Sequence, residues 1–410
     1  MAIETSLQAQ VDAQLMEQGA FAPLELLFNS GRLLYGDYAS WRRREVPLLD
    51  GVLMGNREKI GAEIEQAVAY ARSIGLAEQP QQFFAWHSGD GDKPLRISTD
   101  AQLQRLIGSR YIPAQNAPQM DLFFDNPVVA LANGIVQALT TRNMADAQRQ
   151  LDRLYAQAPN HPDLAAFDQL LAALGLLGHA GNDPRAELEF LLEVTPAARR
   201  LLGAQSRDLL SPLWQQLADS LRGVAFSPDQ PALHRSFALG QAQDWAGVSD
   251  NVLGEPGWQL HVPLCLRLVE SAFCRRRRVE ALLAWCQLCW ASPGQAADAV
   301  SKLRQPDLTA LWQQFLDSEP DLPAAEQSAE PALSAADFPA WLLLREPGLA
   351  VQLPADLPVG SSRAEDNYRC VHRWIQARRA NRAAEEVALR KTLQASHPIL
   401  FEVLKQSVRK

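Results

Sequence analysis

The sequence has few of the residues that would stabilise a small secreted protein or hold a chain in a membrane. Five cysteines occur among 410 residues, and such a sparse, odd-numbered set argues against a disulfide framework. The longest nearly apolar run, Ala281–Ala291, is interrupted by Gln287 and is about half the ~20 residues that a membrane span needs. The N-terminus has neither a basic region nor a continuous apolar core, so we expect no secretory signal. We therefore expect a cytoplasmic protein without a membrane span.

A large excess of one charge is also missing. The chain carries 39 basic and 47 acidic residues, a net charge of −8, which excludes a generally basic nucleic-acid coat but leaves room for a local basic patch. Hydrophobic residues make up 47% and charged residues 21% of the chain. These values are typical of globular proteins and exclude wholesale disorder. The length accommodates two to three domains of ~100–200 residues each.

Catalytic motifs are absent from the sequence as well. The seven histidines are scattered, and there is no nucleophile elbow, Walker A loop, zinc-protease motif or dinucleotide-binding glycine fingerprint. The stretch Gly89–Asp92 lacks the terminal glutamate of a calcium-binding loop. We therefore expect no enzymatic activity and no cofactor.

From residue 126 onward the pattern predicts one helix after another. Apolar residues recur every three or four positions, and proline, glycine, asparagine or aspartate occupies the breaks. Helices joined by such short turns are antiparallel neighbours, and a stack of helical hairpins forms a solenoid. The predicted fold is therefore mainly α, an α-solenoid of antiparallel helical hairpins.

Internal similarity supports a repeated unit. The turn and helix start at 142–147 align with 243–248, 278–281 and 381–383, which places small, inward-facing residues at Ala147, Val248, Ala281 and Ala383. Successive members of this set are 101, 33 and 102 residues apart. These intervals are close to one or three times ~34, the period of tetratricopeptide repeats.

The stretch Val128–Pro162 resembles a degenerate tetratricopeptide repeat (TPR), and the resemblance extends over about 126–317 and, more weakly, 362–408. The residues near the family's characteristic positions are Leu131, Gly134, Ala138, Ala147, Leu151 and Pro159. The family's usual Trp and Tyr of the first helix are missing, and the repeats vary in length. The resemblance implies a TPR-like, non-enzymatic scaffold that binds a protein or peptide. A related helical repeat or an ordinary helical bundle remains an alternative.

The composition divides the chain into four segments. We expect an N-terminal, mostly helical module with a small β-hairpin formed by 82–86 and 95–98, and a further strand or linker at 120–124. An acidic, proline-containing linker is expected to separate the repeats from a basic C-terminal segment, because it has few apolar residues to bury. The expected segments are 1–125 for the N-terminal module, 126–317 for the TPR-like repeats, 318–337 for the linker and 338–410 for the basic helices. The apolar run Phe338–Leu344 is expected to dock onto the repeats, with partner binding as the alternative.

One cysteine pair has the spacing of a metal or redox site. Cys286 and Cys289 share a helix face at i and i+3, and His261 and Cys265 at i and i+4 could complete a tetrahedral zinc site. Because cysteine is among the residues most often buried, we favour buried thiols without a metal.

Two basic regions are candidate partner-binding surfaces. The run Arg275, Arg276, Arg277 and Arg278 lies at a turn between predicted helices, where it could bind an anionic group or form a solvated hairpin tip. Trp41–Arg44 has the same two interpretations, with Trp41 as a core residue. The last 49 residues hold eleven basic and five acidic residues. Within them, the candidates for contact with a partner are Arg369, Arg373, Trp374 and Arg378. The acidic linker of the same chain could equally be that partner.

These observations predict a scaffold or adaptor that binds a partner protein through a helical-repeat surface. The alternative is a nucleic-acid-binding accessory protein that uses the Arg275–Arg278 cluster and the basic C-terminal helices. In these helices the aromatics Tyr368, His372 and Trp374 lie among the basic residues. A terminal pair of capping helices with a polar outer face explains the same pattern. The third hypothesis is a metal or redox site at Cys265, Cys286 and Cys289. The sequence leaves the oligomeric state and the partner undetermined.

Overall fold

The chain is mainly helical, as the sequence predicts. The computed structural model describes residues 2–85, 93–113, 127–178, 183–303, 305–318, 333–356 and 362–409. Helices make up 72% of the structure, with 20 α-helices and little strand. No helix in this described part is long and apolar enough to cross a membrane.

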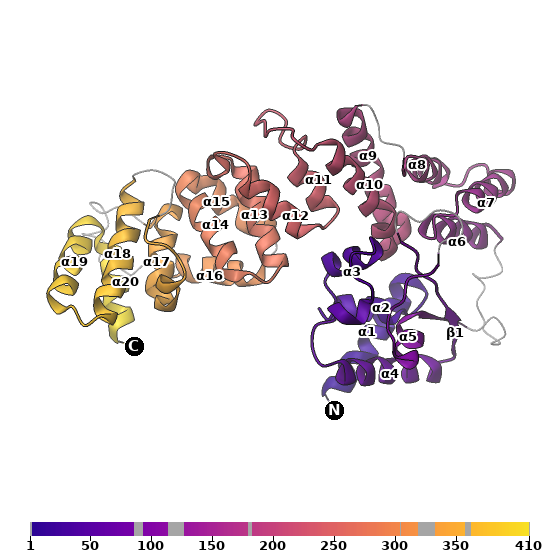
Figure 1. Cartoon of the computed structure of the whole chain (residues 1–410), viewed down its shortest axis with the longest axis horizontal. Coiled ribbons are helices and arrows are strands. Elements are labelled where there is room, and N and C mark those ends of the chain that lie inside the picture. Colours follow the sequence, from indigo (N-terminus) through magenta and orange to yellow (C-terminus); the bar gives the residue numbers. More distant parts are fainter. Residues whose placement is uncertain are drawn as a thin grey trace. The chain divides into compact units, whose positions relative to one another are not determined.

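The chain divides into two compact units (Figure 1). The first comprises Met1–Arg222 with Gln241–Asp244, and the second comprises Gly223–Gly240 with Trp245–Lys410. This division groups the predicted N-terminal module with the first helical hairpins, and the predicted basic segment with the later ones.

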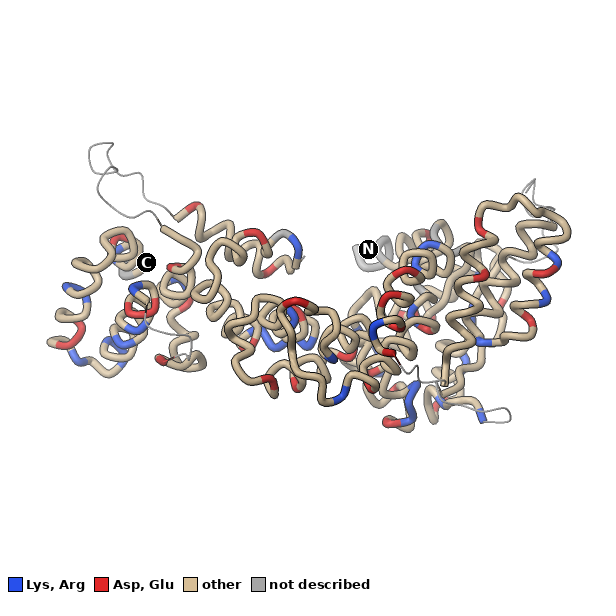
Figure 2. The backbone as a smooth tube through the Cα atoms, turned by 90° about the horizontal axis from the view of Figure 1, so that it is seen from above, with Lys and Arg blue, Asp and Glu red and all other residues tan. Residues whose placement is uncertain are grey.

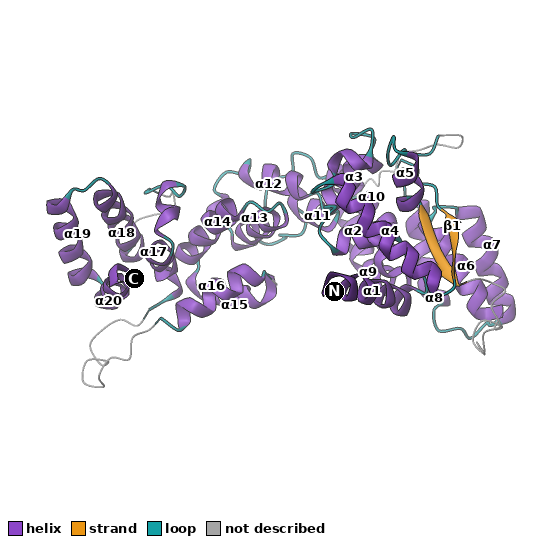
Figure 3. Ribbon diagram, turned by 90° about the horizontal axis from the view of Figure 1, so that it is seen from below, coloured by secondary structure: helices purple, strands orange, loops and turns teal. Residues whose placement is uncertain are grey.

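The N-terminal part of the first unit combines five helices with the two β-strands of the described residues, drawn in orange in Figure 3. The elements are α1 (Ala2–Gln18), α2 (Pro23–Asn29), α3 (Tyr35–Arg42), the 3-10 turn η1 (Leu49–Val52), α4 (Arg57–Ser73), β1 (Leu76–Pro80), α5 (Ala101–Ile107) and β2 (Ser109–Pro113). Their apolar side chains form one core in which Phe21, Trp41 and Tyr111 are fully buried. The burial of Trp41 agrees with its predicted place in the core, and its indole Nε1 donates a hydrogen bond to the backbone oxygen of Arg96 at 2.9 Å.

The small sheet does not lie where the sequence predicts a hairpin. Strands β1 and β2 pair antiparallel, with Leu76 opposite Pro113 and Pro80 opposite Ser109. Around the predicted hairpin, Leu95 N donates a backbone hydrogen bond to Phe83 O at 2.7 Å, but neither described flank is a strand. Its turn, 86–92, and the predicted strand 120–124 lie outside the described residues. The sequence did not indicate β1, because it is a short, mostly exposed strand without the apolar alternation that marks a half-buried strand.

The remaining helices of the first unit form successive hairpins. They are α6 (Pro127–Thr140), α7 (Met144–Gln157), α8 (Leu164–Gly175), α9 (Pro184–Leu202) and α10 (Ser206–Ser220), with the 3-10 turn η2 (Gly203–Gln205) before α10. Helix α7 packs on α6 and α8, and α9 packs on α8 and α10. Each helix therefore contacts its neighbours in the chain, the packing expected of stacked hairpins.

The second unit contains the helices from α11 to α20. They are α11 (Arg235–Gln241), α12 (Trp245–Leu253), α13 (Val262–Cys274), α14 (Arg278–Ala291), α15 (Pro293–Leu303), α16 (Pro306–Leu316), α17 (Phe338–Arg345), α18 (Arg363–Arg379), α19 (Ala383–Ser396) and α20 (Pro398–Arg409), with the 3-10 turns η3 (Trp258–Leu260), η4 (Ala335–Asp337) and η5 (Pro347–Val351). Helix α14 packs on α13 and α15, and α18 packs on α17 and α19. Helix α20 returns to pack on α17 as well as on α19.

Several of the aligned turns share one backbone geometry. Arg142, Gln243, Arg276 and Asn381 all have a positive φ, between 53° and 59°, although β-carbon sterics make this conformation uncommon outside glycine. After α6, α13 and α18 the hydrogen bonds are also equivalent. In α6, for example, Asn143 N donates to Ala138 O and Arg142 N to Leu139 O. The hydrogen bond from Asn143 N to Ala138 O spans six residues and is the one found in a Schellman motif, which satisfies the last carbonyls of a helix.

Three of the four predicted inward-facing positions are confirmed. Ala147, Val248 and Ala281 are fully buried, each five residues after the positive-φ residue of its turn. Ala383 is instead exposed, because it is the first residue of α19 and not the fourth. The fifth residue after Asn381 is Glu386. The predicted interval of 102 residues between Ala281 and Ala383 was therefore wrong.

The end of the predicted linker belongs to the folded part of the second unit. Residues 319–332 lie outside the described residues. Residues 335–337, which we assigned to the linker, form η4, and Asp337 closes a capping box with Ser334. Asp337 is buried and its Oδ1 lies 3.5 Å from His397 Nε2. This buried pair holds η4 against the turn between α19 and α20.

The apolar run Phe338–Leu344 docks within its own unit, as expected. It forms most of α17, and all seven of its residues are buried. The rings of Phe338 and Trp341 pack against Phe315 of α16, at centroid distances of 5.4 and 5.5 Å. This segment is therefore not available to a partner in this conformation.

Candidate partner-binding surface

The cysteines are buried thiols in the core of the second unit. Cys265, Cys286 and Cys289 are fully buried, and all five cysteines are free. Burial raises the pKa of Cys265 to about 12, so its thiol stays protonated and donates weakly to Trp258 O at 3.6 Å. The proposed fourth ligand, His261, packs against the ring of Phe226 with a centroid distance of 4.7 Å.

Nothing in this region has the geometry of a metal centre. Across the described residues, no group of three or more histidine, cysteine, aspartate or glutamate side chains is arranged to hold a metal ion. The metal and redox hypothesis therefore gains no support from the structure.

A serine, a histidine and a glutamate lie in hydrogen-bonding order in the second unit. The Nδ1 atom of His234 lies 2.8 Å from Ser236 Oγ, and its Nε2 atom lies 3.4 Å from Glu255 Oε2. This order resembles a catalytic triad, but Ser236 is fully buried and its Oγ accepts a hydrogen bond from Arg267 Nη1 at 2.9 Å. Because no substrate can reach the serine, the arrangement stabilises the start of α11 and is not an active site.

The first unit contains a buried polar network that the sequence does not predict. The carboxylate of Asp208, in the first turn of α10, accepts hydrogen bonds from Tyr38 and Arg42 of α3. Arg142 Nη2 donates to the backbone oxygen of Asp208 at 2.7 Å. The network joins the N-terminal helices to the first hairpins, so its role is structural. These residues lie far apart in the sequence, and no local pattern could have brought them together.

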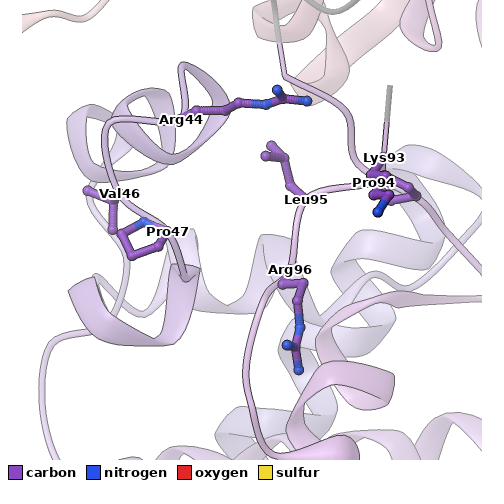
Figure 4. Close-up of a pocket in the computed structure, with 7 residues that line it drawn as sticks. All are labelled: Arg44, Val46, Pro47, Lys93, Pro94, Leu95 and Arg96. Atoms are coloured by element: carbon purple, nitrogen blue, oxygen red, sulfur yellow. The ribbon is translucent and has the colours of Figure 1, made fainter. Parts of the chain in front are cut away.

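A hollow in the N-terminal part of the first unit is shallow, and its cationic side chains do not converge. It has a volume of about 580 Å³ and is lined by Arg44, Val46, Pro47, Lys93, Pro94, Leu95 and Arg96. Figure 4 shows the Arg44 side chain passing over Leu95, whereas Arg96 extends away on the other side. Three cations that point apart cannot surround one anion, so this hollow is a weak candidate for a ligand site.

The arginine run 275–278 forms the tip of the α13–α14 hairpin. Arg276 and Arg277 are exposed, and Arg277 Nη1 pairs with Glu280 at 2.8 Å. Arg278 forms two hydrogen bonds with Glu346, at 2.6 and 2.8 Å. The charge of the run is thus partly neutralised by carboxylates of the same unit, which favours a solvated hairpin tip over an anion site.

The aromatic residues of the C-terminal region do not lie on the surface. Tyr368, His372 and Trp374 are all buried, because they occupy the inward face of α18. Trp374, which we expected to contact a partner, is therefore inaccessible, and the structure presents no aromatic platform on which a base could stack. This burial removes the feature that most favoured nucleic-acid binding.

The basic residues of the same helix lie outward and differ in their partners. Arg369 lies within 3.5 Å of three carboxylates, those of Glu365, Asp366 and Asp356. Arg373 lies 3.8 Å from Glu385, and Arg378 lies over the ring of Trp374 at 5.5 Å. Arg369 is thus bound within its own chain, whereas Arg373 and Arg378 are exposed.

Further cations follow along the chain into α19, where Arg390 is half-buried and Lys391 is exposed. Residues 373–391 contain Arg373, Arg378, Arg379, Arg382, Arg390 and Lys391, against only Glu385 and Glu386. Figure 2 shows blue Lys and Arg segments together with red Asp and Glu segments on the part of the chain near the C-terminus.

Comparison with known proteins assigns no family to the chain. No family model, no curated protein and no solved structure matches it. The TPR-like resemblance therefore stays a prediction, and the function must be argued from the geometry.

Proposed function

We propose that this protein is a non-enzymatic scaffold that binds a partner protein through a surface of stacked helical hairpins. The observation that carries the proposal is the recurring hairpin turn. The turns after α6, α13 and α18 share a positive-φ residue and the same pair of backbone hydrogen bonds. Helical repeats of this kind present extended surfaces, and such surfaces recognise segments of other proteins.

The burial of three nucleophilic side chains favours the same proposal. Ser236, Cys286 and Cys289 are nucleophiles by type, but each is fully buried. A nucleophile must be reachable by its substrate and activated by a neighbouring base or a lowered pKa. Burial instead raises the pKa values of Cys286 and Cys289. These three groups therefore serve packing, which is consistent with a protein that acts by binding.

Affinity purification of the full-length protein from its native cells tests the proposal. We expect a protein to co-purify in a fixed ratio, to survive nuclease treatment, and to rebind the purified chain in sedimentation velocity. Recovery of nucleic acid alone would support the alternative function. If no protein rebinds, and the purified chain turns over a substrate, the scaffold proposal is wrong.

A further inference from the structure

The chain between α10 and α11 forms a long loop in the second unit. Residues 223–234 contain no helix or strand, and a connection of this length without secondary structure of its own is uncommon in a folded domain unless it serves a function. Val224, Ala225 and residues 227–230 are exposed. Because so little of the loop is buried, its attachment depends on a few contacts, and segments of this kind open locally at a low free energy.

The contacts that hold the loop meet at one buried cluster. The backbone oxygen of Pro231 accepts a hydrogen bond from Arg267 Nη2 of α13 at 2.7 Å, and the backbone N–H of Phe226 donates to Glu255 Oε1 at 3.1 Å. The ring of Phe226 packs edge-on against that of His234, with a centroid distance of 5.6 Å. His234, the last residue of the loop, is buried, and its Nε2 atom lies 3.4 Å from Glu255 Oε2. The imidazole therefore contacts the same groups that hold the loop.

The hydrogen bonds around His234 determine where its proton lies. Ser236 Oγ accepts a hydrogen bond from Arg267 Nη1 at 2.9 Å and lies 2.8 Å from His234 Nδ1. Because the carboxylate of Glu255 faces Nε2, the imidazole proton lies on that atom, and Nδ1 accepts the hydroxyl proton of Ser236. The cluster is thus satisfied by a neutral imidazole.

A second proton on His234 would disturb this cluster. It would occupy Nδ1, which would then donate to the same serine oxygen as Arg267, so that one hydroxyl group would lie between two cations. The charged groups that act on the imidazole among the described residues are Arg267 and Glu255. Burial and the charge of Arg267 lower the pKa of His234 below its ordinary value of 6.5, and Glu255 offsets them only in part. The attached loop therefore disfavours the imidazolium.

We propose that His234 is a pH-sensitive latch, which holds the loop 223–234 against α13 at neutral pH and releases it in mild acid. In the released loop the imidazole is hydrated and takes up a proton at about pH 6.5, whereas in the attached loop it does so only at a lower pH. Attachment is therefore strongest above about pH 6.5 and weakens as the pH falls below that value, by at most about tenfold per pH unit for one proton. This device goes beyond the proposed scaffold function and does not depend on it.

Hydrogen exchange of the full-length protein, measured by mass spectrometry between pH 5 and pH 8, tests the proposal. The rates are corrected for the intrinsic pH dependence of amide exchange. We expect the amides of residues 223–234 to lose protection by about fivefold between pH 7 and pH 5, whereas those of α14 keep theirs. A titration of the histidine ring resonances by nuclear magnetic resonance gives the second readout, and we expect the signal that is lost in His234→Gln to titrate below pH 6.5.

Two variants separate the latch from a general effect of acid. His234→Gln keeps a neutral polar side chain that cannot take up a proton, so we expect the exchange of the loop to become independent of pH. His161→Gln replaces a half-buried histidine of the first unit and is the matched control, which should retain the full pH dependence. Circular dichroism melting curves check that both variants are folded.

Three results would overturn the proposal. The first is equal corrected exchange of residues 223–234 at pH 5 and pH 7, and the second is a pH dependence that persists in His234→Gln. The third is a parallel loss of protection in α14, because acid would then unfold the second unit as a whole. If His234→Gln does not fold, the exchange and the ring titration of the unmodified protein still decide the question.

Discussion

The carboxylate of Asp208 accepts a hydrogen bond from the hydroxyl of Tyr38, 170 positions earlier in the chain, at 3.0 Å. The same oxygen lies 3.1 Å from Arg42 Nη1. Arg42 is almost completely buried, and its Nε donates to the backbone oxygen of Phe84 at 2.9 Å. The network therefore fixes α3 against the first turn of α10 with a charge pair shielded from solvent.

Substitution Asp208→Asn should destabilise the first unit by about 3 kcal/mol. The amide keeps an acceptor for Tyr38 but removes the charge that balances Arg42, and an uncompensated buried charge is costly. Urea unfolding, followed by hydrogen exchange in α3 and α10, measures the change. Asp219→Asn is the matched control, because Asp219 forms an exposed pair with Arg222 that should contribute less than about 1 kcal/mol. Equal effects of the two substitutions would show that the network contributes little.

The burial of the cysteines predicts how fast their thiols react with an alkylating reagent. Cys265, Cys286 and Cys289 should resist iodoacetamide at pH 8 in the folded protein, because burial raises their pKa values and the thiolate is the reactive form. Cys274 is partly exposed, and burial together with Glu270 raises its pKa to about 11, so it should react slowly. All five cysteines should react in guanidinium chloride. Rapid labelling of Cys286 or Cys289 in the folded protein, read by peptide mass spectrometry, would revive the redox hypothesis.

The helical part of the fold was predictable from the sequence because its signals are local. The turn at Arg142-Asn143 ends α6 and Asn143 caps α7, its side chain accepting a hydrogen bond from Asp146 N at 3.0 Å. Apolar spacing then places Ala147 in the core. The burial of Phe338–Leu344 in α17 was likewise foreseeable from seven consecutive residues without a charge.

Features that depend on distant residues were not predictable. The strand β2 follows α5 and pairs with β1 thirty or so positions earlier, and neither segment alternates in polarity. The orientation of α18 decides which of its residues are accessible to a partner. Trp374 alternates with arginines in the sequence, which suggested an exposed aromatic residue, but its side chain is buried. Of the predicted residues on this helix, Arg373 and Arg378 are exposed whereas Trp374 is buried, a difference that the sequence alone does not indicate.

Acid should weaken the contacts around Glu78 in the first unit. Arg105 donates two hydrogen bonds to this carboxylate at 2.7 Å, and Arg72 donates a third at 2.6 Å. These contacts lower the pKa of Glu78 from 4.5 to about 2. Because the folded pKa lies below the unfolded value, the stabilisation is fully present above about pH 4.5 and is lost as the pH falls towards 2.

The substitution Glu78→Gln removes this pH-dependent contribution. We expect the melting temperature of the variant to lie below that of the unmodified protein by a constant amount above about pH 5, and the difference to disappear near pH 2. Differential scanning calorimetry across this range measures it. Glu189→Gln removes an exposed carboxylate of the same unit and controls for the loss of one negative charge. A difference that stays constant down to pH 2 would contradict the assignment.

The docking of α17 predicts a large cost for truncating its core side chains. Leu343 is fully buried, so Leu343→Ala should destabilise the second unit by about 2–5 kcal/mol through lost contacts and the cavity left behind. Leu316→Ala, at a position that is 53% exposed, should change stability by less than about 1 kcal/mol. Thermal unfolding monitored by tryptophan fluorescence compares the two. A small effect of Leu343→Ala would indicate that α17 is only weakly docked in the second unit. The alternative that this segment binds a partner would then be favoured again.

The corrected register of the hairpin repeat can be tested with one pair of substitutions in the second unit. Ala281 is fully buried five residues after the positive-φ residue Arg276, whereas Ala383 is exposed at the start of α19. Added methylene groups in a packed core force neighbouring side chains to shift, so Ala281→Leu should cost about 1–3 kcal/mol. Ala383→Leu should change stability by less than about 0.5 kcal/mol, since its side chain extends into solvent. If Ala383→Leu proves the more destabilising in urea unfolding, the alignment made from the sequence is right and Ala383 is the inward-facing position of the last hairpin.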